Sequence, residues 1–130
     1  MVLNPDCVRD VLLTVEGCSF NQHLTLQALC DQLPAYSEED IHYTCIKLEE
    51  GGYLKLITFS GLRMTIPGIK QINDLTFQGH EFLNSIRETS NWTKVKDTAK
   101  KVGTFSLHSL GMIAQEVSKA AIVSALQLNP

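Results

Sequence analysis

The chain has 130 residues, of which 44% are hydrophobic and 19% are charged, and its formal net charge is −3. A chain of this length and composition can bury one core. No cationic segment precedes an apolar one at the start of the sequence, so we expect no signal peptide and a cytoplasmic location.

Four cysteines are present, and no two have the C-x-x-C spacing typical of zinc and redox sites. Cys30 and Cys45 fall on the apolar faces of predicted helices, which favours reduced core thiols over disulfides or metal ligands. The four histidines stand singly, and no glycine-rich phosphate loop occurs. We therefore expect no metal site, no cofactor and no enzyme activity.

The first predicted helix begins at Asn4, a good N-cap, has Pro5 at its first position and ends at Gly17. Its apolar stripe consists of Val8, Val11, Leu12 and Val15. Thr25 caps a second helix, and Pro34 ends it because proline lacks an amide hydrogen. The apolar stripe of this helix consists of Leu26, Leu29, Cys30 and Leu33.

Ser37 begins a third helix, with acidic residues at its positive end and Gly51-Gly52 after its last turn. Its inward face is predicted from Ile41, Cys45 and Leu48. Two short apolar runs follow, 53–59 and 62–66, and Ser60-Gly61 between them suits a two-residue hairpin. Leu62, Met64 and Ile66 alternate with polar residues, so the pattern predicts that they face the core.

Thr76 caps a further helix that carries Phe82, Leu83 and Ile86 on one face. The order of elements from 25 to 87 is that of a winged helix-turn-helix. The predicted fold is mostly α with a small β-hairpin: a winged helix-turn-helix core, an N-terminal helix and two C-terminal helices. We expect a domain over 1–89 and a helical extension over 90–130.

The extension begins with a helix that Ser90 can cap. Trp92, Val95, Ala99 and Val102 are expected inward. The outward side carries four lysines, which are more often a solvated face than a phosphate-binding patch. These lysines are Lys94, Lys96, Lys100 and Lys101.

Ser106 caps the last predicted helix, Leu107 to Gln127. Eight of the twelve residues from 117 to 128 are apolar, which favours burial on more than one side. The segment is too short, and too interrupted by Glu116 and Lys119, to span a membrane. A homodimer would cover it, and the alternative is burial within the same chain between the first helix and the 90–102 helix. The expected dimer contacts are Val117, Ala121, Ile122 and Leu126.

Three blocks of sequence resemble a known family. They are Asn4 to Asp10, then Leu75-Thr76-x-x-Gly79-His80-Glu81-Phe82-Leu83 with Ile86-Arg87, and Trp92-x-Lys94-x-Lys96 with Gly103-x-Phe105-Ser106-Leu107. A leucine-threonine-x-x-glycine helix start after a wing is similar to that of winged-helix proteins. Together the blocks look like a domain of unknown function found in phages, prophages and bacterial mobile elements. The resemblance implies fold and genomic setting, and it implies no activity.

Charge is unevenly distributed along the chain. Residues 1–60 carry three basic residues and nine acids, a balance of −6, whereas residues 61–130 carry eight basic residues and five acids, a balance of +3. The third helix, 38–50, would be the recognition helix, and it has one lysine and five acids. That is poor chemistry for a phosphate backbone.

Two functions follow from these features, and the DNA-binding regulator ranks first, on the frequency of the fold alone. Fold analogy favours a DNA-binding transcriptional regulator that acts on double-stranded DNA. The acidic recognition helix favours an accessory protein that binds a phage or host protein, such as a repressor, a replication protein or a defence protein. An ordinary solvated face is the third possibility. The candidate contacts with DNA or a partner are His42, Tyr43, Ile46, Lys47, Lys55, Arg63 and Lys70.

Overall fold

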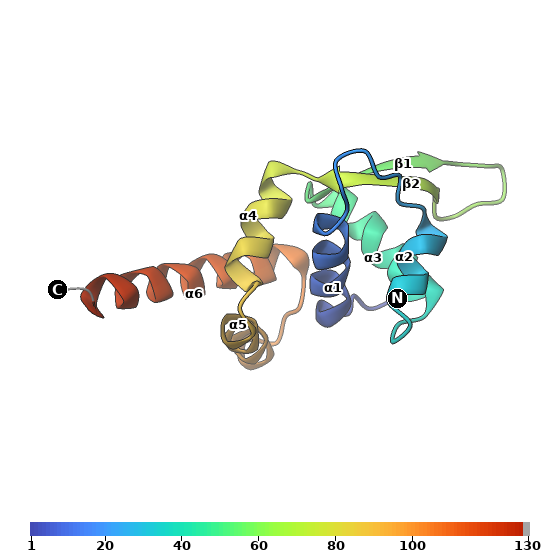
Figure 1. The fold of residues 1–130 in the computed structure, drawn as a ribbon. Coiled ribbons are helices and arrows are strands. Elements are labelled where there is room, and N and C mark those ends of the chain that lie inside the picture. Colours follow the sequence, from blue (N-terminus) through green and yellow to red (C-terminus); the bar gives the residue numbers. More distant parts are fainter. Residues whose placement is uncertain (129–130) are drawn as a thin grey trace. The chain divides into compact units, whose positions relative to one another are not determined.

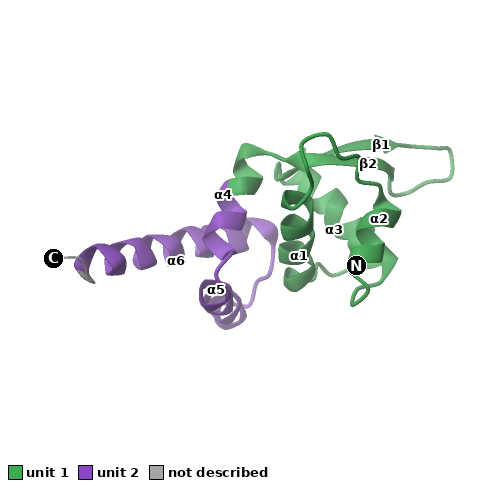
Figure 2. Ribbon diagram, viewed as in Figure 1, with its two compact units in different colours: residues 1–80 green, residues 81–130 purple. Residues whose placement is uncertain are grey.

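The computed structural model describes residues 1–128, and the side chains of residues 1–127. This part of the chain is mostly helical, with one antiparallel pair of strands (Figure 1). It forms two compact units, residues 1–80 and 81–130, coloured separately in Figure 2. The division falls inside one helix, and the expected domain boundary after residue 89 stays a prediction. The elements are α1 (Pro5–Glu16), α2 (Leu26–Gln32), α3 (Glu38–Glu50), β1 (Leu54–Phe59), β2 (Gly68–Leu75), α4 (Phe77–Ile86), α5 (Thr89–Val102) and α6 (Leu107–Leu128).

The first three helices begin where their capping residues predict. The Asn4 side chain accepts hydrogen bonds from the amides of Asp6 and Cys7, at 3.0 and 3.4 Å. Thr25 Oγ1 accepts from the Ala28 amide, and Ser37 Oγ accepts from the Asp40 amide, each at 3.1 Å. Each cap therefore satisfies an amide that has no partner within its helix.

The hairpin differs from the prediction in its second strand. That strand is β2, from Gly68 to Leu75, and residues 62–66 lie in the exposed connection between the strands. Leu62, Met64 and Ile66 are therefore exposed, although their alternation predicts burial. The pairing with β1 shifts register twice, between Lys55 and Leu56 and between Ile57 and Thr58. The buried residues of β2 include Ile69, Ile72 and Leu75, three apart, so a period of two could not reveal the strand.

Leu24, which lies between α1 and α2, pairs with the outer edge of β2. Leu24 forms an isolated bridge to Ile72, whose amide donates to the Leu24 carbonyl at 2.8 Å. β2 is therefore flanked on both sides. Within residues 1–128 the ladder of β1 is formed with β2 alone, which makes β1 the outer strand.

The core of the first unit lies between α1, α2, α3 and the hairpin, since α1 packs on α2, α3 and β2 and α3 also packs on β1. Burial of these apolar side chains is the main source of stability. The Thr44 hydroxyl of α3 donates to the Cys7 sulfur of α1 at 3.4 Å, so this buried polar group is satisfied. Fully buried members of the core include Val8, Val11, Leu12, Leu24, Leu29, Ile41, Leu48, Leu54 and Ile72.

In the second unit α5 packs against α6. α5 begins at Thr89, so Ser90, the predicted cap, lies inside the helix. The N-cap is Glu88, two residues earlier, and its side chain makes no capping hydrogen bond. Gly103 ends α5 with a φ of 87°, a geometry that glycine adopts without strain. Val102 is 67% exposed although its spacing predicts an inward position, because it is the last helical residue of α5. Ser106 caps α6 as predicted, accepting from the Ser109 amide at 3.1 Å.

A candidate binding surface on the hairpin and α3

The hairpin segment, residues 54–73, carries most of the large apolar side chains that the first unit exposes. Each of the five is at least 40% exposed, and Leu62 is completely so. The same segment contains three basic residues and no acid. It thus combines apolar surface with positive charge. The five apolar residues are Ile57, Phe59, Leu62, Met64 and Ile66, and the three basic residues, all exposed, are Lys55, Arg63 and Lys70.

The remainder of this unit has the opposite charge. Residues 1–53 and 74–80 contain two basic residues and ten acids, a balance of −8. Residues 54–73 have a balance of +3. The hairpin is therefore a positively charged apolar projection from an acidic unit.

The predicted contact residues of α3 differ in burial: Ile46 is buried, and His42, Tyr43 and Lys47 are half-buried. Ile46, which spacing places outward, is only 6% exposed, and this prediction was wrong. α3 packs against α1 and α2 and also against β1, so its buried face is wider than one stripe. Tyr43 is half-buried, and its hydroxyl donates to the Met1 carbonyl at 3.2 Å.

Lys47 stands beside Tyr43 but shares its charge with an acid. Its Nζ lies 3.0 Å from the Glu50 carboxylate and 5.4 Å from the centre of the Tyr43 ring. The hydrogen bond to Glu50, followed by the charge of Glu50, raises the pKa of Lys47. The single cation of α3 is therefore already paired, and the exposed residues of this helix include Glu39 and Glu50.

His42 is the residue that joins α3 to the hairpin. Its Nε2 lies 2.7 Å from the Pro67 carbonyl oxygen, at the end of the connection that precedes β2. Because that oxygen can only accept, Nε2 is the donor of this hydrogen bond. His42 is half-buried, so the structure gives it a positioning role rather than a free outward position.

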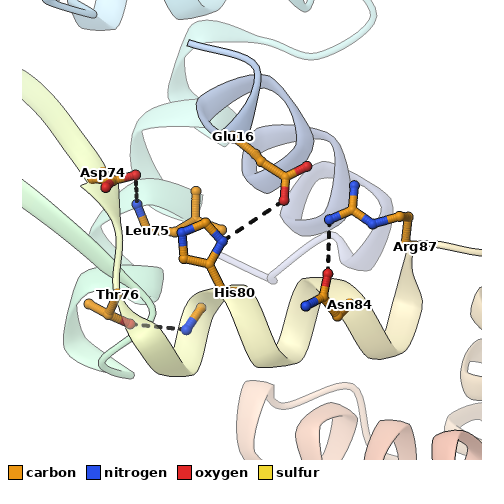
Figure 3. Close-up of polar contacts among 8 residues, drawn as sticks. Glu16, Asp74, Leu75, Thr76, His80, Asn84 and Arg87 are labelled. Carbon is orange, nitrogen blue, oxygen red and sulfur yellow. Dashed lines mark hydrogen bonds and ion pairs between the residues drawn. The ribbon is translucent and has the colours of Figure 1, made fainter. Parts of the chain in front are cut away.

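The most distinctive motif of the sequence, at the start of α4, has a structural explanation, and Figure 3 shows the hydrogen bond that its Thr76 side chain accepts. Thr76 Oγ1 accepts from the Gly79 amide at 3.0 Å and donates to the Gly52 carbonyl at 2.5 Å. The Thr76 amide donates to the Tyr53 carbonyl at 3.1 Å. A Cβ atom at Gly79 would overlap that same carbonyl oxygen. Thr76 and Gly79 together hold the first turn of α4 against the turn after α3.

His80, next to this motif, contacts one acid. Its Nδ1 lies 3.9 Å from the Glu16 carboxylate, longer than a hydrogen bond, and both side chains are partly exposed (Figure 3). Just after the end of α4, Arg87 donates to Asn84 Oδ1 in the last turn of the helix at 3.0 Å. These contacts orient surface side chains around the helix.

The cysteines are reduced in this structure, and they differ in burial. Cys45 is buried as predicted, and so is Cys7, whereas Cys30, which was also predicted to be a core thiol, is only half-buried, as is Cys18. Burial raises the pKa of each of the four thiols above the ordinary value. In the part of the chain that the structure describes, no three histidine, cysteine or acidic side chains gather in a way that could hold a metal ion.

The basic residues of α5 lie mainly in solvent. Lys94, Lys100 and Lys101 are exposed, and Lys96 is half-buried with its Nζ 5.5 Å from the centre of the Trp92 ring. On α6, Val117 is half-buried, whereas Ala121, Ile122 and Leu126 are exposed. None of the helices in residues 1–128 is long and apolar enough to cross a membrane.

Sequence patterns alone did not reveal the exposed apolar side chains of the hairpin. Period-two alternation assigned three of them to the core. One signal in the sequence could have indicated their exposure: the twenty residues from 54 to 73 contain no acid in an otherwise acidic region. The order of elements points to the third helix as the recognition helix. The exposed hairpin is the better candidate for a binding surface.

The structure is mostly helical with one β-hairpin, and sequence comparison assigns the chain to a family. The chain belongs to the family described as "Hypothetical protein (DUF2513)", which matches residues 2–106. The match ends before α6. An uncharacterized protein of Haemophilus influenzae is 31% identical over 119 residues, which cover 90% of this chain and 95% of that protein. No solved structure matches the chain.

Proposed function

We propose that the protein is a binding module of the winged-helix type, of phage or mobile-element origin, whose hairpin acts as the wing and binds another protein. The order α1, Leu24, α2, α3, β1 and β2 supports this assignment, with Leu24 in the position of the short first strand. The resemblance of the sequence to phage and prophage proteins supports the origin. A phage or host protein is the partner in this proposal.

One observation carries the choice of a protein over DNA. The hairpin exposes five large apolar side chains around three cations, and the exposed surface of α3 is acidic. Apolar and arginine side chains are enriched at the centre of protein interfaces, whereas affinity for DNA depends on many cations placed against phosphates. Ile46 is buried and Lys47 is paired with Glu50, so α3 offers little to a major groove.

The charge of the hairpin also indicates which kind of surface the partner presents. A surface with apolar residues, Arg63 and Lys70 is complementary to a surface with apolar residues and acids. The proposed partner therefore presents an apolar patch with carboxylates at its rim. Most of the affinity is expected from burying the apolar surface of Leu62, Met64 and Ile66, and the cations are expected to affect mainly the association rate.

The experiment that tests this proposal compares two double variants in a capture assay with extracts of the natural host, read by mass spectrometry. Leu62→Ser with Ile66→Ser should abolish capture of a specific protein, and circular dichroism should be unchanged because both side chains are exposed. Arg63→Ala with Lys70→Ala should weaken capture less. Capture that is unaffected by the Leu62 and Ile66 substitutions would contradict the proposal.

A DNA-binding regulator is the second candidate, and the three hairpin cations favour it. Lys55, Arg63 and Lys70 are exposed and would contact phosphates. In that case Arg63→Ala with Lys70→Ala should flatten the salt dependence of a gel shift, by about 0.9 in the log–log slope for each phosphate that is no longer neutralised. A protein that shifts no DNA at low salt would exclude this candidate.

A further inference from the structure

α6 extends well beyond the helix on which it packs. α5 has 14 residues and α6 has 22, so at about 1.5 Å per residue α6 is longer by roughly 12 Å. Its first half contains Leu110 and Ala114, both completely buried. Every residue from Lys119 to Gln127 is exposed. We call residues 119–128 the α6 overhang.

The overhang continues the pattern by which α6 packs against α5. A stripe with alternating steps of three and four residues runs along the whole helix, the spacing of helices that pack side by side. Its earlier members are buried or half-buried, and its later members, Ala121 and Ser124, are exposed. The stripe consists of Leu107, Leu110, Ala114, Val117, Ala121 and Ser124.

An open groove lies along this exposed part of the stripe. Its volume is about 430 Å³, and it is bounded by Lys94 of α5 and by small residues of α6. Small side chains allow a second helix to approach the backbone closely. The α6 residues that form the groove are Val117, Ala120, Ala121, Ser124 and Ala125.

The overhang has almost no charge to keep it in water. Residues 120–127 contain no charged side chain, and Leu126 is 68% exposed and Ile122 58% exposed. The preceding Glu116 and Lys119 are paired with each other at 3.6 Å. The occupant of this surface must therefore be apolar along most of its contact, with one acceptor for the Lys94 ammonium.

From this geometry we infer that the occupant is the α6 overhang of a second copy, running antiparallel. In that arrangement the exposed stripe of each copy covers the other, and the carboxyl end of each helix reaches the Lys94 side of the partner's groove. Helix carboxyl ends carry partial negative charge and attract cations, so Lys94 receives the acceptor that it requires. The contact is isologous and closes as a twofold dimer.

The proposed contact extends the packing of α6 on α5. The first half of the α6 stripe contacts α5 of the same chain, and its second half contacts α6 of the second copy. The small size of this interface favours weak association. Two overhangs of about three turns bury less than the roughly 1,200–2,000 Å² of a stable interface. The dimer is therefore expected to form in the micromolar range and to dissociate on dilution. This inference uses the second unit alone and is independent of the binding partner of the hairpin.

Sedimentation of the full chain between about 1 and 300 μM tests the inference, with concentrations chosen around the micromolar affinity expected for a small interface. The wild type should change from monomer to dimer over that range. Ala121→Glu should weaken the dimer more than tenfold, because it places a charge in the contact. Thr93→Glu, at an exposed position of α5 on a different face from Lys94, adds the same charge elsewhere and should leave dimerisation unchanged. A monomer at 300 μM, or equal effects of the two substitutions, would overturn the inference.

Cross-linking tests the orientation. In an antiparallel pair that crosses between residues 121 and 124, position 121 of one copy lies near position 124 of the other, whereas in a parallel pair equal positions meet. A mixture of Ala121→Cys and Ser124→Cys chains should form a mixed disulfide faster than either variant alone, with the wild type as the background for the four native cysteines. Faster cross-linking within either single variant would contradict the antiparallel dimer. If a monomer of the Ala121→Cys chain protects the introduced thiol from a thiol reagent, the overhang is covered by the same chain and the inference is wrong.

Discussion

Gly79 lies so close to the backbone carbonyl of Tyr53 that no side chain fits at residue 79. The carbonyl cannot retreat freely, because it accepts the Thr76 amide at 3.1 Å. We expect Gly79→Ala to lower the free energy of unfolding by about 1–3 kcal/mol, the usual cost of overpacking. Urea denaturation followed by circular dichroism measures the change.

Gly17→Ala is the matched control for this substitution. A Cβ at Gly17 would be 3.4 Å from its nearest neighbour, and its φ of −70° suits any residue. The free energy of unfolding should change by less than about 1 kcal/mol. Equal destabilisation by the two alanines would show that the contact with Tyr53 is not what requires glycine.

Thr76 holds the same junction with its hydroxyl, which both accepts and donates a hydrogen bond. Thr76→Val keeps the shape and removes both bonds, so we expect a loss of about 1–3 kcal/mol from the cap and the unpaired Gly52 carbonyl. Thr93→Val, on the exposed face of α5, should cost less than about 0.5 kcal/mol. Thermal denaturation of the two variants would compare them, and similar melting temperatures would count against this role of Thr76.

His42 should control the mobility of the hairpin connection rather than the stability of the whole protein. Replacing His42 with alanine removes the 2.7 Å hydrogen bond to the Pro67 carbonyl. Amide hydrogen exchange should then accelerate within residues 60–67, while exchange in the buried part of α1 stays unchanged. Glu39→Ala is the control on the exposed surface of α3 and should alter neither region. Uniform acceleration would indicate a general loss of stability instead.

The buried thiols predict how stability depends on pH. Burial raises the pKa of Cys45 above its ordinary value of 9.0, and neighbouring Cys7 and Cys30 raise it further. The folded state therefore retains the thiol proton at pH values where the unfolded state loses it. This contribution is complete below pH 9 and decreases as pH rises above it, so the free energy of unfolding should fall between pH 9 and 11.

Urea denaturation at several pH values measures this decrease, and Cys45→Ala is the comparison. The variant should be less stable at pH 7, because it leaves a cavity, but its stability should fall less steeply above pH 9. Thiol labelling at neutral pH provides a second measurement. Half-buried Cys18 and Cys30 should react before Cys7 and Cys45, and an equal rate for all four would contradict the burial assigned to them.

The helix starts could be predicted because each depends on a few adjacent residues. Asn4, Thr25, Ser37, Thr76 and Ser106 all cap the helices that they were expected to cap. The sequence motif around Thr76 and Gly79 could be noticed from the sequence but not explained from it. Its partners, Gly52 and Tyr53, are more than twenty residues away in the chain.

The errors arose where distant segments determine burial. Ile46 is buried because the hairpin covers a second side of α3, which the spacing within one helix cannot reveal. β2 was missed because two register shifts break its alternation. The exposed surface of the hairpin, and with it most of the candidate site, depended on the position of that strand.

The exposed position of β1 has a consequence for the behaviour of the protein in concentrated solution. The outer strand reads Leu-Lys-Leu-Ile-Thr-Phe, a six-residue segment with strong β-propensity, no proline and one charge. Open strands of this composition recruit further strands and initiate fibrils. Lys55 is the residue that opposes this assembly, since stacking chains would bring its ammonium groups together. Neutralising Lys55, or replacing it with an uncharged residue, should therefore allow the protein to form amyloid fibrils.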